Sequence, residues 1–141
     1  MFRNIVVPAD LTDRNRDAIA MAARLVESER GKVHLLHVIE TIPGFSLDEE
    51  KEFYEKLEKA ATRHLEKLAE PLREAGIPFR AEVVYGPRAK TILEEAERLD
   101  ADLIVMRSHR ALAKGGQAQE GWGTLSYQIG IFAALPVLLV K

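Results

Sequence analysis

Short apolar runs alternate along the chain with longer segments of helical periodicity, and this alternation restricts the fold more than any other feature. The runs are rich in Val, Ile and Leu, as expected of strands buried in a parallel sheet. The predicted strands are Phe2 to Ala9, Lys32 to Ile39, Phe79 to Tyr85, Leu103 to Met106 and Pro136 to Val140.

Helical patterns fill the four intervals between these strands. They are expected from Thr12 or Asp13 to about Arg30, from Leu47 to Gly76 with a kink or restart near Pro71, from Gly86-Pro87 to about Leu99, and from about Thr124 to Ala133. The expected inward-facing residues are Ala18, Ile19, Ala22, Leu25 and Val26 in the first helix, and Phe53, Leu57, Ala60, Ala61, Leu65, Leu68 and Leu72 in the second. Strict alternation implies right-handed crossovers and predicts an α/β fold with a doubly wound, mostly parallel sheet of five strands and four helices.

The bulk composition narrows the class of protein. A chain of 141 residues with 47% hydrophobic and 30% charged residues is expected to form one globular domain, residues 1–141. A net charge of −2 gives no electrostatic case for nucleic acid or an anionic membrane, and the absence of cysteine excludes thiolate chemistry. The first strand begins without a signal-peptide layout, and no apolar run is long enough to span a bilayer, so we expect a cytoplasmic protein.

The carboxyl ends of the strands are where such a sheet binds ligands, and the loops there carry the candidate residues. Asp10 follows the first strand, where a carboxylate can accept hydrogen bonds from ribose, hold a metal ion or cap the next turn. Position alone leaves a binding role and a capping role open. Arg107, His109, Arg110 and Lys114 follow the fourth strand. Together with the helix start at Gly123-Thr124, these cations are suited to phosphate, the alternative being a solvated loop.

Several other kinds of site are disfavoured by the residues present. The pair Ser108-His109 lacks a G-x-S-x-G elbow, and adjacent residues rarely act as nucleophile and base. Neither G-x-G-x-x-G nor G-x-x-x-x-G-K-[ST] occurs, which removes dehydrogenase and P-loop interpretations, and the acids of a response-regulator receiver are missing. His34 and His37 are spaced to face opposite sides of a strand, so we expect core or interface histidines and not one metal site.

Motifs in order along the chain resemble the universal stress protein family. The opening Ile5 to Thr12, the second strand Leu36 to Ile39, and Gly86-Pro87 with its following helix are similar to family segments. Ala101 to Met106 and Pro136 to Val140 match the family's fourth and last strands. The resemblance implies a Rossmann-like fold of strand order 3-2-1-4-5, and a homodimer through the last strand.

The resemblance also implies an adenine nucleotide, ATP or AMP, in a stress-response or regulatory role, and Mg²⁺ can accompany it. Asp10 would meet the ribose, Val38 and Ala9 the base, and Arg107, Arg110, Thr124 and Ser126 the phosphates. The full set of candidate binding residues is Ala9, Asp10, Val38, Met106, Arg107, Arg110, Gly123, Thr124 and Ser126. No catalytic residue is expected, since neither a general base near the phosphates nor an adenylyl-transfer motif is found.

The phosphate loop departs from the family pattern G-x-x-G-x9-G-[ST]. Arg107 and Arg110 replace its first two glycines, and the spacer Ala111–Trp122 has twelve residues. Glycine lets backbone amides approach phosphate closely, whereas arginine adds bulk and also supplies donors suited to phosphate oxygens. Either side-chain charge has replaced the backbone cradle and nucleotide binding is retained, or the chain is a homodimeric interaction module that binds no nucleotide.

Overall fold

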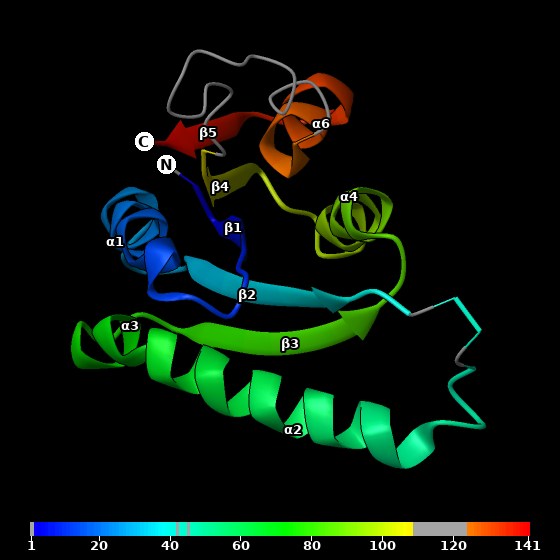
Figure 1. The fold of residues 1–141 in the computed structure, drawn as a ribbon. Coiled ribbons are helices and arrows are strands. Elements are labelled where there is room, and N and C mark those ends of the chain that lie inside the picture. The colour runs from blue at the N-terminus through cyan, green and yellow to red at the C-terminus, as the bar shows by residue number, and fades with distance from the viewer. Residues whose placement is uncertain (1, 42, 45, 109–123) are drawn as a thin grey trace, which may run out of the picture.

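The computed structural model describes residues 2–41, 43–44, 46–108 and 124–141 of the chain. Its five strands form one sheet of order β3-β2-β1-β4-β5, and each neighbouring pair is parallel (Figure 1). The strands are β1 (Asn4–Pro8), β2 (Lys32–Ile39), β3 (Phe79–Tyr85), β4 (Leu103–Arg107) and β5 (Val137–Val140). The predicted doubly wound fold and strand order are confirmed.

Helices cover both faces of this sheet. The elements are the 3-10 turn η1 (Asp13–Asn15), α1 (Arg16–Leu25), α2 (Lys51–Leu68), α3 (Glu70–Glu74), α4 (Arg88–Arg98) and α6 (Leu125–Phe132). Buried side chains of α1, α2 and α3 pack on one face, and those of α4 and α6 on the other (Figure 1). None of the described helices is long and apolar enough to cross a bilayer.

The core is divided by the sheet into two clusters, which explains the apolar strands. Along β1, Ile5 and Val7 point into the cluster under α1, while Val6 points into the cluster under α4. All three side chains are fully buried. A strand covered on both faces cannot alternate apolar with polar residues, because each residue faces a packed helix.

The first helix ends earlier than its periodicity predicts, at Leu25 and not near Arg30. Val26 adopts an extended conformation and forms a parallel bridge with Phe2, and the backbone amide of Glu27 donates to the carbonyl of Phe2 at 2.7 Å. This pairing with the start of the chain competes with continuation of the helix. The predicted restart near Pro71 is confirmed, since α2 ends at Leu68 and α3 begins at Glu70.

The inward face of α2 was predicted wrongly in its first half. Phe53 and Leu57 are 42% and 37% exposed, and Ala60 is exposed, whereas Tyr54 is only 2% exposed. This half of α2 runs along the edge strand β3 (Figure 1), where the Tyr54 ring meets the ring of Tyr85 edge to face, with centroids 6.0 Å apart. A helix beside an edge strand buries a narrower stripe than one over the middle of the sheet.

Candidate functional site

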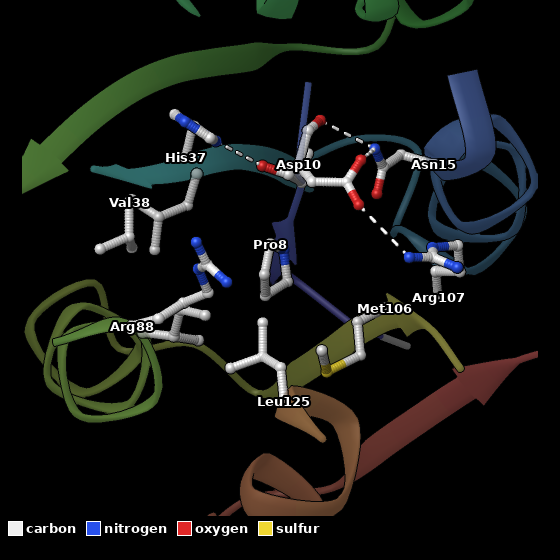
Figure 2. Close-up of a pocket in the computed structure, with 12 residues that line it drawn as sticks. Pro8, Asp10, Asn15, His37, Val38, Arg88, Met106, Arg107 and Leu125 are labelled. Atoms are coloured by element: carbon white, nitrogen blue, oxygen red, sulfur yellow. Dashed lines mark hydrogen bonds and ion pairs between the residues drawn. The ribbon is translucent and has the colours of Figure 1, made fainter. Parts of the chain in front are cut away.

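A cavity of about 100 Å³ lies at the carboxyl ends of β1, β2 and β4, beside the first turns of α4 and α6. Figure 2 shows the polar side chains of Asn15 and Arg107 beside Asp10, and the apolar side chains of Met106 and Leu125 at the side of β4 and α6. The described lining residues are Pro8, Ala9, Asp10, Asn15, Leu36, His37, Val38, Arg88, Ile92, Met106, Arg107 and Leu125. The cavity therefore stands where an open α/β sheet binds ligands.

The carboxylate of Asp10 is held by the turn that follows β1. Its Oδ1 accepts hydrogen bonds from the backbone amide of Thr12 at 3.0 Å, from the Thr12 hydroxyl, and from Nδ2 of Asn15 at 2.7 Å. Asn15 is buried, and its amide also donates to the carbonyls of Asp10 and Thr12, both at 2.9 Å. The turn-capping role considered for Asp10 is thus present, and the same carboxylate faces the cavity.

The second oxygen of Asp10 pairs with an arginine from β4. Nη2 of Arg107 lies 3.3 Å from Oδ2 of Asp10, and the two side chains are 24% and 43% exposed. Nε of Arg107 is buried and has no hydrogen-bond partner among the described residues. The guanidinium at the first position of the altered glycine motif is therefore directed to the carboxylate implied to hold ribose.

These contacts change the acidity of Asp10. Partial burial acts to raise the pKa, but the hydrogen bonds from Thr12 and Asn15 and the charge of Arg107 outweigh it, so the pKa lies below its ordinary value of 3.8. A carboxyl with a lowered folded-state pKa contributes stability above the unfolded-state pKa, and this contribution is lost as the pH falls through the lowered value.

Removing the Arg107 charge is therefore expected to raise the pKa of Asp10 toward 3.8. Arg107→Met keeps the aliphatic bulk of the side chain, and a ¹³C NMR titration of the Asp10 carboxyl in both proteins measures the change. The difference in unfolding free energy between the two proteins should shrink as the pH falls from neutral to about 2. An unchanged Asp10 titration in the variant would show that the ion pair is not formed in solution.

The opposite side of the cavity is formed by β2 and α4. Ring Nδ1 of His37 lies 2.8 Å from the carbonyl oxygen of Ala9, which joins the ends of β1 and β2. Arg88 is the first residue of α4, and its backbone amide donates to Oε1 of Glu40 at 3.2 Å. Gly86 lies close against Thr91 of α4, because its φ is 147° and a Cβ there would lie 2.4 Å from Oγ1 of Thr91.

The structure brings five of the predicted residues together around the cavity: Ala9, Asp10, Val38, Met106 and Arg107. Thr124 instead caps α6, its hydroxyl accepting from the amide of Tyr127 at 3.4 Å, and Ser126 is buried; neither is among the described lining residues. The other predicted residues, Arg110 and Gly123, lie outside the described part of the chain, as do His109 and Lys114.

Three polar lining residues, Asn15, His37 and Arg88, were not among the residues predicted from the sequence. Arg88 begins a helix that follows a strand, and this position was a signal that could have identified it as a candidate. His37 was interpreted as a core or interface histidine, although it lies near the carboxyl end of its strand. Asn15 carried no signal, since only the folded turn places its amide against Asp10.

The described residues give no support to bound magnesium. Within residues 2–41, 43–44, 46–108 and 124–141, no group of three His, Cys, Asp or Glu side chains is placed to hold a metal ion. Asp10 is the acidic side chain among the described lining residues, and its oxygens are engaged by Thr12, Asn15 and Arg107.

Comparison with known proteins gives a consistent family match. A model of the universal stress protein family matches residues 1–141. A universal stress protein of Thermus aquaticus is 31% identical over 143 residues, which cover 100% of both chains. The solved structure of the protein MJ0577 has a TM-score of 0.81 at 26% identity and covers 100% of this chain and 96% of that one. A family protein of Arabidopsis thaliana, solved with AMP bound, has a TM-score of 0.69 at 20% identity, over 99% and 91% of the two chains.

Proposed function

The chain belongs to the universal stress protein family, and we propose that it binds an adenine nucleotide, ATP or AMP, in the cavity beside Asp10 as part of a stress-response or regulatory role. The observation that carries the proposal is the Asp10 carboxylate, which Thr12 and Asn15 hold in place in the same cavity as the apolar side chains of Val38 and Ile92. The structural relative from Arabidopsis thaliana that was solved with AMP bound supports the choice of ligand.

Each part of the nucleotide has a proposed partner. Val38, Ala9 and Met106 would contact the base, since apolar side chains suit a flat aromatic ring. Asp10 would accept hydrogen bonds from the ribose hydroxyls. The phosphates would lie toward the loop after β4, with Arg110, Gly123, Thr124 and Ser126 as candidate contacts.

Ribose binding to Asp10 would require Arg107 to leave the oxygen with which it is paired. Oδ1 of Asp10 already accepts hydrogen bonds from Thr12 and Asn15, so Oδ2 is the oxygen with more capacity for a ribose hydroxyl, and Arg107 is paired with it. We propose that a ribose hydroxyl replaces Arg107 as the partner of Oδ2, and that the released guanidinium then contacts the phosphates. The exchange keeps the arginine paired with an anion throughout.

A thermal-shift titration of the wild-type chain with ATP, ADP and AMP tests the proposal. A ligand that binds only the folded state raises the melting temperature, and the rise grows with the ratio of the ligand concentration to Kd. We expect a concentration-dependent rise with each nucleotide and no rise with ribose 5-phosphate, which lacks the base. Absence of any shift at millimolar nucleotide, with the protein folded, would contradict the proposal.

A second candidate function is a homodimeric interaction module that binds no nucleotide. The observation in its favour is the same ion pair, because Arg107 already fills the free side of Asp10. Dimerisation would use β5, which lies at one edge of the sheet. Analytical ultracentrifugation with and without ATP, read beside the thermal shift, separates the two functions: this module predicts a dimer and no nucleotide effect.

A further inference from the structure

The cavity has a second arginine, which lies across from the ion pair of Asp10 and Arg107. Arg88 reaches from the start of α4 toward Pro8 and Val38 (Figure 2). One turn further along the helix, Ile92 is 1% exposed and packs in the same cluster as Val38. Arg88 therefore lines the cavity beside the apolar residues Val38 and Ile92.

No carboxylate among the described residues pairs with the guanidinium of Arg88. This differs from Arg107, which pairs with Asp10, and from Arg98, which pairs with Glu82 and Glu95. An arginine that lines a cavity and has no carboxylate partner among the described residues suits one of two ligand features, an anionic group or the face of a flat ring.

Glu40 decides between these two features. Its carboxylate accepts the backbone amide of Arg88 at 3.2 Å and so occupies the N-terminus of α4. Anionic ligand groups favour free helix N-termini, and a carboxylate already placed there repels a phosphate. The apolar surroundings of Val38 and Ile92 are likewise suited to an uncharged ring and not to a phosphate.

We propose that Arg88 is a ligand-binding residue that lays its planar guanidinium over the exposed face of the purine ring, with Val38 and Ile92 at the other side. This inference rests on the proposed nucleotide function and deepens it, since it assigns a specific residue to recognition of the base. Arg88 then contributes to affinity through the ring alone, and the contribution does not depend on how many phosphates the ligand carries.

Calorimetric titration of adenosine, AMP and ATP into wild type and Arg88→Ala tests this assignment. We expect the variant to weaken all three ligands by the same factor, about five- to tenfold. Lys90→Ala is the matched control, because it removes one positive charge from the same turn of α4 at an exposed side chain paired with Glu94. The control should leave all three affinities unchanged.

The outcomes separate the assignment from the proposal on which it rests. If wild type binds and Arg88→Ala binds equally well, the role of Arg88 is wrong and the nucleotide function stands. A loss that grows from adenosine to ATP would place Arg88 at the phosphates and also overturn the ring contact. If wild type binds none of the three ligands, both proposals fail together.

Discussion

Replacing Asp10 with asparagine will weaken the binding of ATP about 10- to 100-fold while leaving the binding of free adenine unchanged. A hydrogen bond to a charged group contributes about 1.5–3 kcal/mol, and the variant removes the charge that the ribose hydroxyls meet. Asparagine retains an oxygen that can accept from Thr12 and Asn15, as Oδ1 does now, so the turn after β1 is preserved. Its amide group would then face Arg107, donor against donor, in place of the present ion pair.

Calorimetry with ATP and adenine measures the effect, and Asp13→Asn provides the control. Asp13 lies three residues away, is 73% exposed and pairs only loosely with Arg16 at 3.6 Å, so its replacement removes an equal charge outside the cavity. The control should bind both ligands as wild type does. Equal weakening of ATP and adenine in Asp10→Asn would contradict the ribose assignment, because it would show a general disturbance of the cavity.

Replacing Gly31 with alanine will lower the free energy of unfolding by about 3 kcal/mol, a large overpacking effect for one methyl group. An alanine Cβ at this position would lie 2.2 Å from the carbonyl oxygen of Glu27 and 2.4 Å from Cγ2 of Val26. Neither atom belongs to a flexible side-chain end, so the backbone must move. That movement strains the hydrogen bond from Gly31 to Glu27 and the pairing of Val26 with Phe2.

Urea denaturation measures this loss, and Gly130→Ala is a control of opposite sign. Gly130 lies in α6, and an added Cβ there meets no atom of the described residues within 4 Å. Alanine is favoured over glycine within helices by about 0.5–1 kcal/mol, so the control should be slightly more stable than wild type. If Gly31→Ala unfolds at the same urea concentration as wild type, the close packing of Gly31 against Val26 and Glu27 is contradicted.

The fold could be predicted from the sequence because its signals are local. Each strand is an apolar run of its own, and Pro71 marks the break between α2 and α3 without reference to other segments. The end of α1 could not be predicted, because it depends on the pairing of Val26 with Phe2. The buried face of α2 was predicted wrongly for the same reason. Tyr54 is buried in place of Phe53 because α2 packs beside the edge strand β3, which the local pattern does not show.

Some features of the site could likewise be predicted from the sequence, and others could not. Asp10 could be named in advance because it follows the end of a strand, and a parallel sheet brings such ends to one edge. Val38 was named only through the resemblance to the family. The ion pair between Asp10 and Arg107 joins residues 97 positions apart, and no local pattern announces it. The altered glycine motif left open whether its arginines bind phosphate or obstruct the site. The structure adds one fact to this question, the ion pair between Arg107 and the Asp10 carboxylate.

A crystal structure of the chain grown with AMP tests the central claim most directly. The account predicts adenine against Val38, a ribose hydroxyl within hydrogen-bond distance of Oδ2 of Asp10, and Arg107 moved from that oxygen. A cavity without nucleotide at saturating AMP, with the Arg107 guanidinium still paired to Asp10, would contradict it. So would AMP bound elsewhere on the molecule with Asp10 unchanged.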